Sequence, residues 1–124
     1  SGALLVCNEK YSVDIFLGIG GGPEGVLSAS ALDTFNCQFQ GRFIFKEEND
    51  IRRAKEMGVK DLNKKYNLNE IVSGDSIFCA TGVTSGDLVE GIKIKNNNYI
   101  SETFVTHKNS NLKKKIKKVN VLTI

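Results

Sequence analysis

Short apolar runs separated by polar turns mark the first part of the chain. Ala3–Cys7 is continuously apolar, and Val13–Leu17 is rich in β-branched and aromatic residues. Runs of this length and composition predict strands, with Asn8-Glu9-Lys10 as the turn between them. Phe39–Phe45 alternates in part between apolar and polar residues, which predicts a further strand.

A helical repeat of apolar positions follows a glycine-rich segment. Pro23 suits the first turn of a helix, where its missing N–H costs nothing, and Asn36 is a plausible stop. The pattern therefore predicts a helix from Pro23 to about Phe35. Its inner face comprises Leu27, Ala31, Leu32 and Phe35.

A second helix is predicted after Asn49-Asp50, which supplies an N-cap. Ile51, Ala54 and Met57 are expected on its inner side, and Gly58 at its carboxyl end, where a left-handed residue commonly ends a helix.

The second half of the chain favours strands. Residues 61–72 are expected to form short irregular helical turns. The expected strands are 76–81, 92–95, 99–106 and an edge strand at 112–124, with Asn96-Asn97-Asn98 as a hairpin turn. Strands combined with two covering helices predict an α/β fold.

Length and composition indicate one ordinary globular domain. The 124 residues are 40% hydrophobic and 25% charged, which suits a soluble domain spanning residues 1–124. The longest apolar runs have about five residues, whereas a membrane helix needs about 20. No secretory signal is visible at the start, so no membrane association is expected.

The basic charge is concentrated at the end of the chain. Residues 108–124 hold six lysines and no acid, whereas residues 1–107 hold 11 basic and 14 acidic residues. Such a cluster suits either nucleic acid or a solvated edge strand. Ile116 and Val119 interrupt it, and no aromatic residue lies beyond Phe104 to stack on bases. The edge strand is therefore favoured, and no nucleic-acid partner is expected.

Three separated cysteines, Cys7, Cys37 and Cys79, form no Cys-x-x-Cys pair. An odd number of cysteines in apolar stretches suits reduced thiols better than a disulfide framework or a zinc site. This usage predicts a cytoplasmic protein.

The segment Gly18–Gly25 predicts an anion site. Glycines before a helix allow phosphate to approach backbone N–H groups, and the helix dipole favours the same negative charge. No Gly-Lys-Ser/Thr sequence completes a Walker A loop. A Gly-x-Gly-x-x-Gly match at Gly20, Gly22 and Gly25 lacks the acidic residue expected about 20 positions later, so a dinucleotide site is disfavoured.

Glu24 lies in the first turn of this helix, beside the expected phosphate position. A carboxylate gains about 0.3–1 kcal/mol there from the helix dipole. It would also repel phosphate unless a divalent cation lay between them. The residues alone leave a metal ligand and a helix-start acid equally open.

Several motifs together resemble class II fructose-1,6-bisphosphatases of the GlpX type. The resemblance covers essentially the whole chain and implies the carboxyl-terminal α/β lobe of the lithium-sensitive sugar-phosphatase fold, with a mixed sheet and two covering helices. The motifs are Gly18–Val26, Gln40-Gly41-Arg42, Met57-Gly58, Gly74-Asp75 and Ala80–Leu88.

The resemblance also implies an activity and site residues. The activity is Mg²⁺- or Mn²⁺-dependent hydrolysis of the 1-phosphate of fructose 1,6-bisphosphate in gluconeogenesis. Glu24 corresponds to a metal ligand, and Gly21 to a substrate-binding residue. A homo-oligomer is expected.

The chain departs from the family in length. Members are two to three times longer, and their other metal carboxylates lie upstream of the matching part. The chain is therefore expected to lack an amino-terminal lobe and to be inactive alone. Two alternatives stay open: a non-catalytic phosphate- or nucleotide-binding module using Gly18–Gly25, and a structural half that acts only with a separate amino-terminal chain.

The remaining polar candidates are His107, Asp75 and Asp87. His107 is expected at the surface or at a strand end, with no serine or cysteine at a recognisable spacing. Asp75 and Asp87 are expected to be turn or cap residues.

Overall fold

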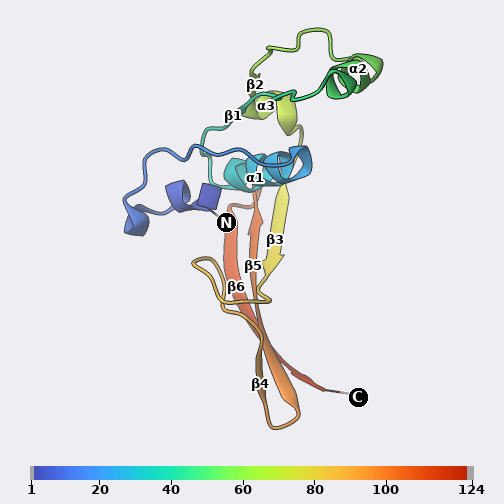
Figure 1. The fold of residues 1–124 in the computed structure, drawn as a ribbon. Helices are drawn as coiled ribbons and strands as arrows, with labels where there is room; N and C mark the ends of the chain where they lie inside the picture. Colours follow the sequence, from blue (N-terminus) through green and yellow to red (C-terminus); the bar gives the residue numbers. More distant parts are fainter. Residues whose placement is uncertain (1, 123–124) are drawn as a thin grey trace.

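The computed structural model describes residues 2–122 (Figure 1). Its elements comprise two 3-10 helices, three α-helices and six strands. In chain order they are η1 (Gly2–Cys7), η2 (Glu9–Tyr11), α1 (Gly22–Thr34), β1 (Gln40–Gly41), α2 (Glu48–Glu56), β2 (Tyr66–Asn67), α3 (Leu68–Ile71), β3 (Ile77–Thr81), β4 (Lys93–Lys95), β5 (Asn98–His107) and β6 (Leu112–Val121).

β5 is the central strand of the larger sheet. β3 and β4 pair with successive parts of one of its edges, and β6 pairs with the other edge along the full length. All these pairings are antiparallel, and so is the two-stranded β1–β2 sheet. The α/β class is confirmed, whereas the expected mixed sheet is wrong for the described residues. Short hairpin connections such as Asn96-Asn97 favour antiparallel neighbours.

α1 covers one end of this sheet (Figure 1). It packs on β3 and β5 and also contacts η1. The core between α1 and the sheet is small and consists of Ala31, Phe78 and Phe104. The Phe35 ring is stacked on the ring of Phe104, with 6.0 Å between the ring centres. Alternation along β5 buries Glu102, Phe104 and Thr106 on one face.

α2 does not cover the sheet. It lies beyond α1, well away from the four-stranded sheet (Figure 1), so the prediction of two covering helices is wrong. Its N-cap is Glu47, two residues before the predicted Asn49. Met57, expected on the inner side, is 82% exposed. Gly58 has φ +93 and ends the helix as predicted.

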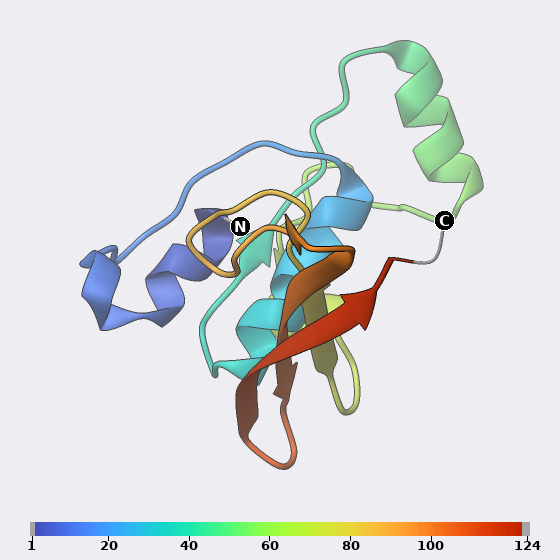
Figure 2. The same cartoon turned by 90° about the horizontal axis from the view of Figure 1, so that it is seen from below.

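Both strands predicted before residue 18 are absent. Residues 2–7 form η1, and residues 12–21 contain no helix or strand. Ile15, Leu17 and Ile19 are at least 75% exposed along this extended segment. A strand needs a neighbour to pair its backbone groups, and no strand within residues 2–122 lies alongside this segment. In both views the amino-terminal part forms an arm at the side of α1 (Figure 1 and Figure 2).

The remaining helices and turns largely follow the sequence. The helix predicted from Pro23 is α1, and Asn36 adopts a left-handed φ of 56 after it. α3 forms in the segment expected to hold short turns, with a capping box between Asn67 and Glu70. Asn96 and Asn97 both have positive φ, as a tight hairpin turn requires.

The predicted strands vary in length. The sequence predicts one strand over Phe39–Phe45, but only Gln40–Gly41 is paired. β3, β4 and β5 confirm their predictions within two residues. β6 confirms the edge strand up to Val121, and its predicted end at residues 123–124 lies outside the described residues.

Candidate functional site

The glycine-rich segment reaches α1 through an N-cap that has no side chain. Gly21 is the N-cap residue, with φ −68 and ψ 156, and no side-chain hydrogen bond caps the helix. The first intrahelical bond runs from the Gly25 N–H to the Gly21 carbonyl at 3.0 Å. The preceding N–H groups are left for an external acceptor such as a phosphate oxygen.

Open space, rather than unusual backbone angles, distinguishes these glycines. None of the glycines from Gly18 to Gly25 has a positive φ. A Cβ at Gly20, Gly22 or Gly25 would meet no atom within 4 Å. The backbone is therefore accessible from outside, as an anion-binding segment must be.

Glu24 folds back over Gly21. A Cβ on Gly21 would overlap the Oε2 atom of Glu24 and would lie 3.2 Å from its Cδ. The carboxylate thus occupies the space above the N-cap, where the helix dipole favours negative charge. The structure brings together the two residues that the resemblance assigns to metal and substrate, and their roles stay predictions.

A single carboxylate does not make a complete metal site. Among residues 2–122, no group of three or more His, Cys, Asp or Glu side chains is arranged to hold a metal ion. Glu24 is exposed and offers hard oxygen donors of the kind that Mg²⁺ and Mn²⁺ accept. It suits one ligand of a divalent cation whose other ligands come from elsewhere.

The carboxyl end of α1 is held by buried polar contacts. Asp33 is 5% exposed and accepts hydrogen bonds from Lys108 Nζ at 2.7 Å and Ser76 Oγ at 2.8 Å. Thr34 Oγ1 donates to Thr106 Oγ1 at 2.7 Å. These contacts attach α1 to β5 and to the residue preceding β3, so they orient the helix whose other end carries Gly21 and Glu24.

His107 has polar partners that sequence reasoning missed. Its Nε2 lies 2.5 Å from Asp75 Oδ2, and its Nδ1 lies 2.7 Å from Ser110 Oγ. Ser110 is three residues further along, in the β5–β6 turn, and sequence spacing did not indicate this contact. His107 does end β5, as predicted. The hydrogen bond from His107 is the largest cause of the lowered pKa of Asp75.

Asp75 lies in the irregular segment before β3, and its side chain contacts the β5–β6 turn. Its Oδ1 accepts a hydrogen bond from the Asn109 N–H at 3.1 Å. The cluster joins the β5–β6 turn to the segment preceding β3. Because the hydrogen bonds of Asp75, His107 and Ser110 hold a turn in place, we assign these residues a structural role.

The basic strand β6 is partly neutralised by the sheet it joins. Lys117 pairs with Glu90 at 3.1 Å and with Glu102 at 3.3 Å, and Lys115 lies 3.6 Å from Glu102. The Glu90 N–H donates to Glu102 Oε1 at 3.1 Å, and this is the first cause of the lowered pKa of Glu102. These pairs favour the structural interpretation of the lysines over a nucleic-acid surface.

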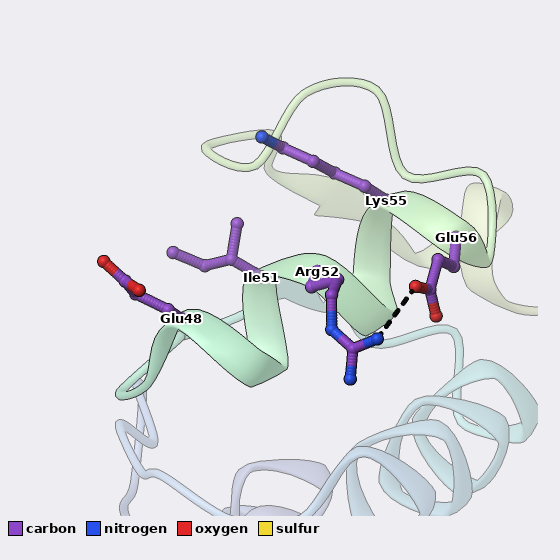
Figure 3. Close-up of a pocket in the computed structure, with 5 residues that line it drawn as sticks. All are labelled: Glu48, Ile51, Arg52, Lys55 and Glu56. Atoms are coloured by element: carbon purple, nitrogen blue, oxygen red, sulfur yellow. Dashed lines mark hydrogen bonds and ion pairs between the residues drawn. The ribbon is translucent and has the colours of Figure 1, made fainter.

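A hollow on α2 offers no comparable site. Its five lining residues all come from this one helix, and Arg52 is paired with Glu56 at 3.3 Å (Figure 3). A shallow surface on one helix lacks the converging polar groups of a ligand site. Within residues 2–122, the helices are all too short or too polar to cross a membrane.

Almost the whole chain matches one known protein family. The family model described as "Bacterial fructose-1,6-bisphosphatase, glpX-encoded" matches residues 1–120. The chain belongs to this family. The predicted GlpX-type resemblance is confirmed.

Three relatives illustrate the extent of the match. A class 2 fructose-1,6-bisphosphatase of Haemophilus influenzae is 35% identical over 98% of the chain and 40% of its own length. Fructose-1,6-bisphosphatase 1 class 2 of Escherichia coli is 34% identical over 97% of the chain and 40% of its own length. A Trichodesmium erythraeum protein, named D-fructose 1,6-bisphosphatase class 2/sedoheptulose 1,7-bisphosphatase, is 32% identical over 85% of the chain and 34% of its own length. The chain therefore spans 40% or less of the relatives it matches.

Proposed function

We propose that this chain forms the carboxyl-terminal part of a metal-dependent phosphatase that converts fructose 1,6-bisphosphate to fructose 6-phosphate. The observation that supports the proposal is the apposition of Glu24 and Gly21 at the open start of α1. The names of the relatives give the reaction, and the family resemblance implies its place in gluconeogenesis. The sedoheptulose bisphosphatase activity named for one relative suggests a second sugar bisphosphate as substrate.

Each part of the site has a distinct role in this proposal. Glu24 would bind one Mg²⁺ or Mn²⁺ ion through a carboxylate oxygen. When bound, such a cation polarises a phosphoryl group and activates water as a nucleophile. The Gly21 backbone and the first free N–H groups of α1 would orient a phosphate or sugar oxygen. The buried polar contacts of Asp33 and Thr34 hold the helix in the orientation that this requires.

The remaining ligands and the group that accepts a proton would come from an amino-terminal lobe. Residues 1–124 would then be a single domain of a larger cytoplasmic enzyme that works as a homo-oligomer. The lithium-sensitive phosphatase architecture is the fold we expect for the two lobes together.

The first test is activity with and without this lobe. The purified chain should release no phosphate from fructose 1,6-bisphosphate above background, because one carboxylate cannot hold the cations that this reaction uses. The amino-terminal part of the Haemophilus influenzae relative, fused ahead of the chain, should restore Mg²⁺- or Mn²⁺-dependent phosphate release. Phosphate release at enzymatic rates by the chain alone would contradict the proposal.

Glu24→Gln in the active fusion tests the ligand role. The amide keeps the side-chain shape but removes the anionic oxygen, so turnover and metal affinity should fall together while the melting temperature stays nearly unchanged. Glu9→Gln provides a matched control, because Glu9 is an exposed first-turn acid of η2. A normal metal titration in Glu24→Gln would leave only a helix-start role for Glu24.

The second candidate is a phosphate-binding module without catalysis. The open glycine backbone at the start of α1 favours it. Binding of inorganic phosphate to the isolated chain without metal, together with an inactive fusion, would support this alternative.

A further inference from the structure

Two of the three cysteines meet in space although 30 positions separate them. The Cys37 thiol donates a hydrogen bond to the Cys7 sulfur at an Sγ–Sγ distance of 3.5 Å. Cys7 is the last residue of η1, and Cys37 lies in the connection that follows α1. Cys79 is exposed on β3.

Neither cysteine of the pair lies in a strand. η1 packs on α1 but has no strand partner, and Cys37 lies between α1 and the short β1. A disulfide has an S–S bond of about 2.0 Å, so closing the gap requires a shift of roughly 1.5 Å. Because η1 belongs to no sheet, it can make this shift without disturbing the β3–β5–β6 sheet.

The surroundings of Cys7 suit an anionic thiol reagent. Cys7 lines an open pocket together with the apolar residues Leu4 and Leu5. The same pocket is lined by three lysines and one acid, namely Lys10, Lys113, Lys115 and Asp87. This excess of positive charge favours the approach of an anionic disulfide such as oxidised glutathione.

We propose that Cys7 and Cys37 form a redox-active thiol pair that closes to an intramolecular disulfide, while Cys79 stays outside the bridge. The oxidant is a small-molecule disulfide, for which oxidised glutathione is the probe. A Cys37 thiolate attacks one glutathione sulfur, which forms a mixed disulfide and releases one glutathione thiolate. Cys7 then loses its proton and attacks the Cys37 sulfur, which releases the second glutathione.

The order of these steps follows from the environment of Cys7. Burial is the first cause that raises the pKa of the Cys7 thiol to about 12, and the negative charge of a Cys37 thiolate beside it acts in the same direction. Cys7 therefore keeps its proton at neutral pH and is the poorer first nucleophile. Oxidation should be slow at neutral pH and should become faster as the pH rises.

The bridge would act on the end of α1 opposite to the candidate active site. It would fix η1 to the residues that follow Thr34, whereas Gly21 and Glu24 lie at the start of the helix. A bridge that closes a loop of this length should raise the melting temperature of the chain, by about 10 °C on the chain-entropy account. This inference does not depend on the proposed phosphatase function.

The experiment uses Cys79→Ser, which leaves only the two cysteines of the pair. The variant is equilibrated with oxidised glutathione, and intact mass, free thiols and melting temperature are then measured. We expect a loss of two hydrogens, no free thiol, no glutathione adduct, and reversal by dithiothreitol. The double variant Cys37→Ser/Cys79→Ser is the matched control and should form no internal bridge.

The wild-type chain gives a second, independent measurement. Peptide mapping after oxidation under native conditions should place the bridge between Cys7 and Cys37, with Cys79 free or carrying glutathione. The same oxidation in guanidinium chloride should yield a mixture of the three possible pairings. Two free thiols, or glutathione on both cysteines of Cys79→Ser, would overturn the proposal. A native bridge that includes Cys79 would overturn it as well.

Discussion

At the scale of single residues, the start of α1 combines two properties that usually conflict. A good helix start has a side-chain cap, yet Gly21 supplies none. Its lack of a side chain leaves room for the Glu24 carboxylate directly above the N-cap. Gly21 therefore contributes no capping hydrogen bond, but its small size lets an anionic oxygen of Glu24 lie beside the free N–H groups of α1.

A substitution at Gly21 should lower metal-dependent activity much more than it lowers the stability of the fold. In Gly21→Ala, the new Cβ overlaps the Glu24 carboxylate, which is the end of a flexible side chain and must move aside. We expect a stability loss of about 1 kcal/mol or less, but a large loss of metal-dependent activity in the fusion with an amino-terminal lobe. Thermal melts and metal titrations of the same protein measure the two effects.

Gly25→Ala is the matched control for this experiment. A Cβ there meets no atom within 4 Å, and alanine favours a helix over glycine by about 0.5–1 kcal/mol. This variant should be slightly more stable and should keep the metal response. Equal losses of activity in both variants would show that Gly21 has no special position.

Asp75 should make the chain sensitive to acid. Its pKa is lowered chiefly by the hydrogen bond from His107, so the folded state favours the ionised carboxylate. The resulting stability is fully present above the ordinary aspartate pKa of about 3.9 and is lost as the pH falls through the lower folded value. Urea unfolding between pH 2 and 6 should therefore show a smaller acid loss for Asp75→Asn than for the wild type. Identical pH dependence in the two proteins would contradict this assignment.

At the scale of elements, the loop between β3 and β4 is tightly packed at two of its glycines, Gly82 and Gly91, where the neighbouring backbone lies close. The Gly91 N–H donates to Ser85 Oγ at 2.9 Å, and the Gly82 N–H donates to the Glu102 carbonyl at 3.1 Å. A Cβ on Gly91 would lie 2.6 Å from the Ser85 nitrogen and 2.7 Å from the Thr84 carbonyl carbon. These neighbours are backbone atoms, so a side chain fits only if the loop shifts.

Gly91→Ala should therefore destabilise the chain by about 1–3 kcal/mol, the usual cost of overpacking. Gly86→Ala is a control in the same loop, because a Cβ there would meet nothing within 4 Å. Chemical denaturation of both variants measures the difference. A Gly91→Ala chain as stable as Gly86→Ala would show that the loop adapts freely.

At the scale of the whole molecule, the described part of the chain leaves much apolar surface uncovered. Its fully buried apolar residues are few, whereas Ile15, Leu17 and Ile19 form an exposed stripe at every second position. Val26 and Leu27 on α1 are also more than half exposed. Large exposed apolar surface usually marks a contact with another structural unit, in agreement with the short coverage of the relatives.

The isolated chain should therefore self-associate. Sedimentation velocity over a range of concentrations should show species larger than the monomer, and Leu17→Glu should shift the distribution toward monomer. Met57→Glu is the matched control, because Met57 is similarly exposed but lies on the mostly charged α2. A strictly monomeric wild type at high concentration would contradict the prediction.

The local sequence was sufficient to predict those helix ends and turns whose backbone angles are determined by neighbouring residues. Pro23 and Asn36 bracket α1, Gly58 ends α2, and Asn96-Asn97 turn the β4–β5 hairpin, because each depends on backbone angles that nearby residues set. The set of motifs from Gly18–Val26 to Ala80–Leu88 was likewise sufficient to identify the family.

Tertiary contacts decided what the sequence pattern left open. Val13–Leu17 has the composition of a strand but lacks a neighbouring strand in the described chain, and strands form only where a partner takes up their hydrogen bonds. Met57 shared a face with apolar residues, yet α2 has no layer to cover. The His107–Asp75 and Cys7–Cys37 contacts join residues about 30 positions apart. Sequence spacing does not encode such distances, because they depend on how the turns and the sheet bring separate segments together.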